Sequence, residues 1–236
     1  QAFLRAPEEG LQIAELCIAP IDNPTQFKTY PFDRSKNNLR WSPDEKSVYF
    51  TAQSNGAAPI YRLDINTQKI VPITGNNDGI SQLEVLPKQL VYVQTNIESP
   101  FELYRSELTG EKAQRLTELN TTWIASKKIS RPEKHIFYNE LNQPIEYWVM
   151  KPINYEDGKK YPVLLEIHGG PSSMWGPGEA SMWHEYQYFC SQGYGVVYCN
   201  PRGSGGYGLD FLKSNVNDWG TGPTRDVLKA LDLTVA

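Results

Sequence analysis

The 236-residue sequence has few cysteines, no long apolar run and no excess of positive charge. Its three cysteines, Cys17, Cys190 and Cys199, are too few for a disulfide framework. Their odd number favours a reducing compartment, which predicts a cytoplasmic location. No run of about 18 apolar residues occurs, so no transmembrane helix is expected. The net charge of −4 gives no support for a nucleic-acid partner or for an anionic membrane surface.

Signatures of metal and cofactor binding are also missing. No cluster of His, Cys and Asp has metal-ligand spacing, and His135 and His184 are expected on the surfaces of a strand and a helix. The glycine-rich segment 203–208 lacks the Gly-Lys-Ser/Thr of a phosphate loop and the spacing of a dinucleotide-binding fingerprint. We therefore expect no metal and no cofactor, and we interpret 203–208 as a structural loop.

Residues 1–130 have the pattern of short strands separated by polar turns, with a hairpin predicted over 60–73. Three dipeptides recur with an offset of 43 residues: Val48-Tyr49 as Val91-Tyr92, Tyr61-Arg62 as Tyr104-Arg105, and Ile73-Thr74 as Leu116-Thr117. A fainter copy covers 16–31. A period in the low forties is typical of β-propeller blades. We expect one partial and two fuller blades, the last of a propeller whose other blades precede Gln1.

Residues 131–236 follow a different pattern. A hairpin is predicted over 136–150, and the segments that follow read as strand, helix, strand, loop and helix: 161–167, 180–192 ending at Gly193, 195–199, 200–208, and a helix from Thr224. An apolar stripe on the last helix consists of Val227, Leu228, Leu231 and Leu233. This order predicts the first part of a doubly wound α/β sheet. The fold class is therefore mixed, with domains at 1–130 and 131–236.

The sequence His168-Gly169-Gly170-Pro171 follows directly on the apolar strand 161–167. A strand that leads into His-Gly-Gly is how α/β-hydrolases present half of an oxyanion hole. The two glycines let the backbone turn sharply and bring an N–H close to a substrate carbonyl. We expect the Gly170 N–H to be that donor, with Gly169 and Pro171 shaping the turn. His168 is expected to hold the loop by hydrogen bonding and not to act as the catalytic base.

No Gly-x-Ser-x-Gly nucleophile elbow occurs in the 236 residues. The sequence thus contains the setting for acyl transfer without the nucleophile. Arg202 opens the glycine-rich loop, and spacing alone allows it to pair with Asp218 or with Asp226. These three residues are predicted to support the site structurally.

Together these motifs resemble the prolyl oligopeptidase family of serine peptidases, and His-Gly-Gly-Pro resembles its acylaminoacyl-peptidase branch. The resemblance rests on Lys151-Pro152, 161–165, 168–171, 200–208 and Asp218-Trp219-Gly220. It implies that the oxyanion glycine falls on Gly170 and the arginine-glycine loop on 202–208. It also implies that the serine elbow, aspartate and histidine come after Ala236, so no triad residue is assigned to this chain.

The resemblance implies a serine-type peptidase that hydrolyses short peptides through an acyl-enzyme, as an acylaminoacyl- or dipeptidyl-peptidase. This fragment alone is expected to be inactive. An esterase of the same fold and a non-catalytic propeller-hydrolase binding protein remain as alternatives. The expected partners are peptide substrates, the remainder of the polypeptide or a complementing fragment, and a second copy in a homo-oligomer. A half-sheet with an open apolar edge is not expected to be stable alone.

Overall fold

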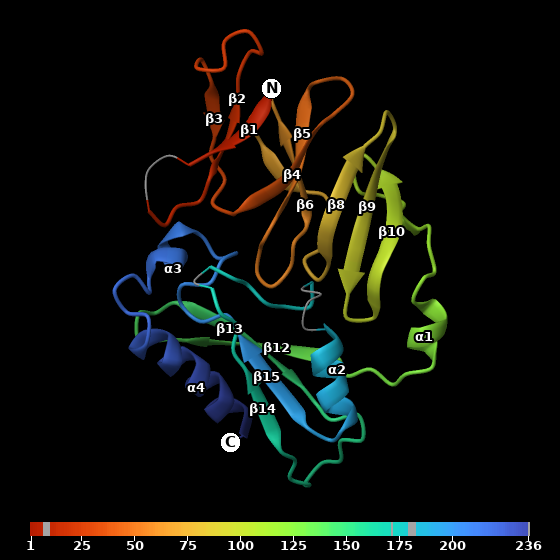
Figure 1. The fold of residues 1–236 in the computed structure, drawn as a ribbon, viewed down its shortest axis with the longest axis vertical. Helices are drawn as coiled ribbons and strands as arrows, with labels where there is room; N and C mark the ends of the chain where they lie inside the picture. Colours follow the sequence, from red (N-terminus) through yellow and green to blue (C-terminus); the bar gives the residue numbers. More distant parts are fainter. Residues whose placement is uncertain (7–9, 171, 179–182, 236) are drawn as a thin grey trace.

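The computed structural model describes residues 1–6, 10–170, 172–178 and 183–235, and within them the strands form four sheets. Three antiparallel sheets follow one another along the first half of the chain and occupy the upper part of Figure 1. The fourth sheet lies below them and carries helices on both faces. The two patterns seen in the sequence therefore correspond to two kinds of sheet.

The strands of the first three sheets pair in sequence order, as in propeller blades. The first blade contains β1 (Ala2–Arg5), β2 (Glu15–Ile18) and β3 (Lys28–Tyr30); the second contains β4 (Lys36–Trp41), β5 (Ser47–Ala52), β6 (Ile60–Asp64) and β7 (Ile70–Pro72); the third contains β8 (Gly79–Val85), β9 (Gln89–Asn96), β10 (Ser99–Glu107) and β11 (Gln114–Arg115). The 43-residue repeat holds in space, because Val48 and Val91 lie on β5 and β9. Likewise, Tyr61 and Tyr104 lie on β6 and β10.

The blades are held together by side chains that alternate across β5, whose six residues are all buried. Phe50 packs toward the first blade with Leu16 and Tyr30, and it stacks on Tyr61 of its own blade with ring centroids 5.8 Å apart. Tyr49 packs on the opposite side with Leu83 and Tyr92 of the third blade. Because successive side chains of a strand point to opposite faces, one apolar strand serves two interfaces.

A buried carboxylate closes the third blade. Glu102 of β10 is 1% exposed and accepts hydrogen bonds from the Thr117 hydroxyl (2.5 Å), the Leu119 amide (3.1 Å) and the Asn120 amide (2.7 Å). These bonds fix the segment that leads into the short helix α1 (Thr121–Ala125), which the sequence did not predict. Burial raises the pKa of Glu102, but the hydrogen bonds outweigh burial and hold this pKa below its ordinary value.

We expect Glu102 to make stability depend on acid pH. Its folded pKa lies below the unfolded value of about 4.3, so its contribution is complete above that value and is lost as the pH falls through the folded pKa. Glu102→Gln should lower the free energy of unfolding at pH 7 by about 2 kcal/mol and flatten its dependence on acid pH. Denaturant titrations of the full-length protein from pH 7 to pH 3 measure both effects. Parallel pH curves for the two proteins would contradict this.

The fourth sheet contains β12 (Pro132–Tyr138), β13 (Pro144–Met150), β14 (Val163–Glu166) and β15 (Gly195–Cys199), in the order β12-β13-β15-β14. Only the pair β14–β15 is parallel, so we call this the mixed sheet. Helix α2 (Trp183–Ser191) packs on one face against Trp148 and Tyr198, and α4 (Thr221–Val235) packs on the other against Tyr147 and Val197. The two central strands, β13 and β15, are thereby buried, whereas β12 is mostly exposed.

Two details of the helices differ from the sequence prediction. Helix α4 begins at Thr221, three residues before Thr224, because Asp218 accepts hydrogen bonds from the Thr221 and Gly222 amides and caps the helix. On this helix Val227 and Ala230 are buried, whereas Leu228 and Leu233 are 48% and 41% exposed. Part of the predicted apolar stripe therefore lies outside the core. Helix α2 ends at Ser191, one residue before the predicted end at 192, and Gly193 follows with φ of 88°. The predicted start of this helix at 180 lies outside the described residues.

The second and third blades touch the mixed-sheet part of the chain backbone to backbone. The Gly178 amide donates to the Gly56 carbonyl at 3.2 Å, and the Asn55 amide donates to the Gly206 carbonyl at the same distance. A side-chain carbon at Gly176 would overlap the Gly56 carbonyl, and one at Gly79 would overlap the Gly178 carbonyl. Glycine is therefore required where the two halves meet.

We expect Gly176→Ala to destabilise the full-length protein by about 1–3 kcal/mol, because the added methyl group forces the two backbones apart. Gly220→Ala is the matched control, since a side-chain carbon there meets nothing within 4 Å. The control should be neutral or slightly stabilising, because alanine lowers the entropy of the unfolded chain. Urea unfolding of both variants compares them. Equal stabilities of Gly176→Ala and Gly220→Ala would contradict a close contact between Gly176 and the Gly56 carbonyl.

Candidate active site

The chain leaves the mixed sheet after β14 and forms the turn His168-Gly169-Gly170, which we call the HGG turn. Gly170 is exposed, and no described residue accepts a hydrogen bond from its N–H. A side-chain carbon at Gly170 would lie 2.7 Å from the Ser172 amide nitrogen, whereas one at Gly169 would meet nothing. The tight turn therefore needs glycine at Gly170 only. Pro171, predicted to shape the same turn, lies outside the described residues.

The His168 side chain is held on both sides of its ring. Nε2 lies 3.1 Å from Asn200 Oδ1 and Nδ1 lies 2.9 Å from the Gly169 carbonyl oxygen. The ring also meets Trp175 edge-on, with centroids 5.3 Å apart. Burial lowers the pKa of His168, although the contacts with Gly169 and Asn200 act in the opposite direction. These contacts tie the His168 ring to the loop, and the Ser204 hydroxyl also lies 3.2 Å from Nε2. That His168 supports the turn and does not act as the catalytic base stays a prediction.

Asn200, immediately after β15, is fully buried and clamps this loop. Its Oδ1 accepts from the Trp175 amide at 2.8 Å, and its Nδ2 donates to the Trp175 carbonyl at 2.7 Å and to the Tyr207 hydroxyl at 2.8 Å. Sequence reasoning missed this residue. A polar side chain directly after a fully buried parallel strand was the available signal, because ligand sites form at the carboxyl ends of such strands.

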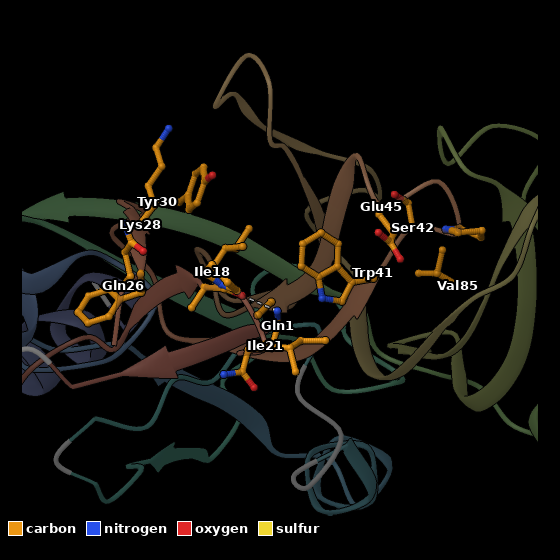
Figure 2. A pocket seen from close by; sticks show the side chains of 15 residues that line it. Gln1, Ile18, Ile21, Gln26, Lys28, Tyr30, Trp41, Ser42, Glu45 and Val85 are labelled. Carbon is orange, nitrogen blue, oxygen red and sulfur yellow. Dashed lines mark hydrogen bonds between the residues drawn. The ribbon is translucent and has the colours of Figure 1, made fainter. Parts of the chain in front are cut away.

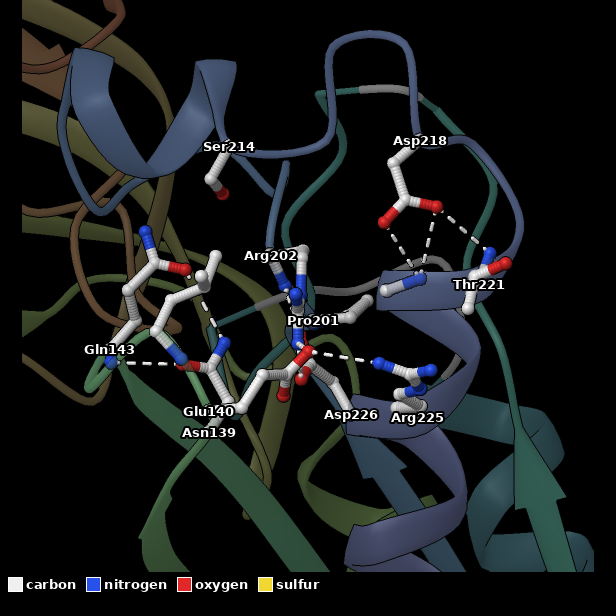
Figure 3. Close-up of polar contacts among 12 residues, drawn as sticks. Asn139, Glu140, Gln143, Pro201, Arg202, Ser214, Asp218, Thr221, Arg225 and Asp226 are labelled. Atoms are coloured by element: carbon white, nitrogen blue, oxygen red, sulfur yellow. Dashed lines mark hydrogen bonds and ion pairs between the residues drawn. The ribbon is translucent and has the colours of Figure 1, made fainter.

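Arg202 lies two residues further along the loop and anchors it to α4 (Figure 3). Its Nε donates to Asp226 Oδ2 at 2.9 Å and its Nη2 to Asp226 Oδ1 at 2.7 Å, with both side chains almost fully buried. Of the two pairings that the sequence left open, the structure forms this one; the pairing with Asp218 is not formed, because Asp218 caps α4 instead. The hydrogen bond to Asp226 raises the pKa of Arg202 above its ordinary value.

Glu140, in the β12–β13 turn, is a second acid at Arg202 and was not identified from the sequence. Its Oε1 lies 2.8 Å from Arg202 Nη2, and the hydrogen bond lowers the pKa of Glu140 to about 2. Residues 201–206 are all buried beside it. The glycine-rich loop therefore presents no open surface for a phosphate and acts as a packed support for the HGG turn.

A broad cavity of about 1200 Å³ lies away from the HGG turn, beside the first blade (Figure 2). Ile18, Tyr30 and Trp41 line it, with Lys28 and Glu45 as its charged residues. Among the described residues that line this cavity there is no histidine or cysteine. In the described part of the chain, no group of three His, Cys, Asp or Glu side chains is arranged to hold a metal ion.

A separate finding concerns membranes: none of the helices described here is both long enough and apolar enough to span a bilayer.

Comparisons with known proteins show which families and structures this chain is similar to. Residues 180–236 match the model of the Prolyl oligopeptidase family. The chain is similar to "Uncharacterized peptidase YuxL" of Bacillus subtilis, with 32% identity over 194 residues that cover 81% of this chain and 29% of that protein. It is also similar to "Dipeptidyl-peptidase 5" of Arthroderma otae, with 26% identity over 226 residues that cover 94% and 31%. The chain thus spans less than a third of these curated relatives.

Among solved structures, an acylaminoacyl peptidase in complex with Z-Gly-Gly-Phe-chloromethyl ketone superposes with a TM-score of 0.84 at 24% identity. The match covers 98% of this chain and 36% of that one. The fold class predicted from the sequence, propeller blades followed by the first part of an α/β-hydrolase sheet, is confirmed by this likeness.

The buried Arg202–Asp226 pair predicts unequal effects of two aspartate substitutions. Asp226→Ala leaves the arginine charge buried with only the half-exposed Glu140 as its acid, and should destabilise the full-length protein by about 3–5 kcal/mol. Asp218→Asn keeps a good helix cap and should change stability by less than about 0.5 kcal/mol. Thermal and urea unfolding of the two variants measure the contrast. A tolerated Asp226→Ala would show that the loop does not depend on the pair.

Proposed function

The chain belongs to the prolyl oligopeptidase family, and we propose that it forms part of a serine-type peptidase that hydrolyses short peptides through an acyl-enzyme. One observation carries the proposal: Gly170 is exposed and no described residue accepts from its N–H, while His168 and Asn200 hold its turn at the carboxyl end of β14. An N–H presented in this way suits the oxyanion of a tetrahedral intermediate.

In the proposed mechanism a serine hydroxyl attacks the peptide carbonyl, a histidine takes its proton, and the amine leaves with that proton to give the acyl-enzyme. Water then repeats the sequence and releases the acid. Gly170 donates to the oxyanion in both steps, a contribution of roughly 3–4 kcal/mol for one donor. We assign the serine, the histidine and its aspartate to the part of the protein that this chain does not span.

The names of the relatives support the proposed substrate class. Their names are those of acylaminoacyl and dipeptidyl peptidases, and one solved relative holds a peptidyl chloromethyl ketone. The blades stand beside the end of the mixed sheet that carries the HGG turn (Figure 1), which supports a role in limiting access to short peptides. The proposed activity is therefore the release of either N-acylated amino acids or dipeptides from short peptides.

The proposal also includes the organisation of the protein. We keep a propeller part at 1–130 and a hydrolase part at 131–236, completed by the rest of the polypeptide or by a complementing fragment. A homo-oligomer and a cytoplasmic location belong to the same proposal. Support for the location comes from Cys17, Cys190 and Cys199, which are all unpaired and buried.

The first test is a fluorophosphonate probe applied to the full-length protein, together with hydrolysis of acetyl-alanyl, alanyl-prolyl and simple ester substrates. We expect covalent labelling of one serine outside residues 1–236 and cleavage of at least one peptide substrate. Hydrolysis of esters alone would identify an esterase. A properly folded protein without labelling would identify a non-catalytic binding protein.

Substitution at Gly170 tests the oxyanion donor itself. Gly170→Pro removes the N–H, whereas Gly170→Ala keeps it and adds the same contact with Ser172. We expect kcat of the proline variant to fall about 10²–10³-fold below that of the alanine variant. Gly169→Ala, which meets nothing, should stay within a few-fold of the wild type. Equal rates for Gly170→Pro and Gly170→Ala would exclude this N–H as the donor.

A further inference from the structure

A row of hydrogen-bonded side chains connects the HGG turn to the second blade. Beyond Asn200, the Tyr207 hydroxyl accepts from Asn200 Nδ2 at 2.8 Å and donates to Glu146 Oε2 at 2.7 Å. Glu146 Oε1 in turn accepts from Asn55 Nδ2 at 3.4 Å. The order His168, Asn200, Tyr207, Glu146, Asn55 thus runs without a break from one half of the chain to the other, and we call it the polar row.

The middle of the row is buried and charged. Glu146 lies on β13 with its side chain 7% exposed, and Lys134 of the neighbouring strand pairs with it at 2.6 Å. Burial and the nearby Glu146 carboxylate raise the pKa of Tyr207 well above its ordinary value, so its proton stays on the hydroxyl. A hydroxyl that donates to a carboxylate and accepts from an amide has a fixed orientation.

The second blade holds this row at two points. The Asn55 side chain reaches Glu146, and the Asn55 backbone amide donates to the carbonyl of Gly206, the residue before Tyr207. The loop that carries Asn55 is itself pressed against Gly176 and Gly178. A shift of the second blade is therefore passed on to Tyr207, and from there to Asn200.

At its other end the row meets the residues that flank the oxyanion donor. Asn200 binds the His168 ring and both backbone groups of Trp175. It therefore connects the first residue of the HGG turn to the segment that follows the turn. Gly170 lies between these two anchors. Movement of Asn200 by a fraction of an ångström changes where the Gly170 N–H points, and misplacement by about 1 Å can lower a rate about 10²-fold.

We propose that Tyr207 and Glu146 are positioning residues for the oxyanion donor, and that through them the second blade sets the position of Gly170. This inference rests on the proposed peptidase function. In this proposal both residues act through Asn200 and neither touches the substrate, so their substitution should weaken binding of the transition state and leave binding of the ground state unchanged.

The test compares Tyr207→Phe with Tyr161→Phe in the full-length protein. Tyr161 precedes β14, at the end of the strand opposite the HGG turn, and among the described residues its hydroxyl bonds only to the Asn154 carbonyl and the Glu156 amide. For Tyr207→Phe we expect kcat to fall about tenfold with KM within twofold of the wild type. The inhibition constant of a peptide aldehyde, which forms an oxyanion on the serine, should rise by the same factor. Tyr161→Phe should match the wild type.

Two further variants separate positioning from simple packing. Glu146→Gln keeps an acceptor for Tyr207, so its kcat should exceed that of Glu146→Leu. Asn55→Ala removes the 3.4 Å bond to Glu146 and the 3.1 Å bond from the Ser54 hydroxyl, places alanine at a φ of 53°, and keeps the backbone bond to Gly206. It should lower kcat about threefold. Circular dichroism and urea unfolding identify any variant that has lost its fold, and the remaining variants decide the question.

The outcomes distinguish the inference from the function on which it rests. A wild-type protein that neither reacts with a fluorophosphonate nor cleaves peptides removes the proposed function, and the inference with it. An active wild type with a folded Tyr207→Phe of unchanged kcat overturns the inference alone. An equal rise in KM and in the inhibition constant of a cleavage product would also overturn it, because that pattern indicates loss of substrate binding.

Discussion

The close approach of two backbones is the constraint on which the rest of this structure depends. Gly56 and Gly176 lie in contact, as do Gly79 and Gly178, and no larger residue fits at Gly176 or Gly79 without displacement. This contact brings Asn55 within reach of the mixed sheet. The candidate site is therefore built by both halves of the chain. A mixed sheet without the second blade would keep the HGG turn but lose one of its supports.

Two residues just after β15 hold the glycine-rich loop and the HGG turn in place, each through contacts with a different neighbour. Asn200 faces the HGG turn and uses both ends of its amide there, whereas Arg202 faces α4 and binds Asp226. Both side chains are buried, so each unmade bond would leave a polar group without water. Such networks favour one arrangement strongly over its neighbours. That selectivity suits the role proposed for this loop, in which the Gly170 N–H keeps one direction.

Local patterns in the sequence were enough to predict much of the fold. The 43-residue repeat, the alternating strands and the hairpin before residue 150 all correspond to observed elements, because each depends on neighbours close in sequence. Contacts between distant segments were not predictable in this way. Spacing could not choose between Asp218 and Asp226 for Arg202, and it contained no sign of Glu140. The position of a domain boundary near residue 130 stays a prediction.

The candidate site shows the same division. The HGG turn was found from four consecutive residues, since a strand that leads into glycines is a local signal. Asn200, Glu146 and Tyr207 were missed, because their roles appear only when β13, β15 and the glycine-rich loop come together. Burial of a polar side chain is a property of the whole fold. Residues that hold a loop in place are therefore harder to predict than residues that form it.

The three buried thiols can report local opening of the fold, because a buried thiol reacts with an alkylating reagent only when it becomes exposed. Burial raises the pKa of Cys190 to about 11 and of Cys199 to about 12, so at neutral pH almost no thiolate exists to react with an alkylating reagent. Cys17 lies in the first blade, and the other two lie on opposite faces of the mixed sheet. Alkylation rates at the three positions would therefore time the opening of a blade and of each sheet face separately, without any introduced label.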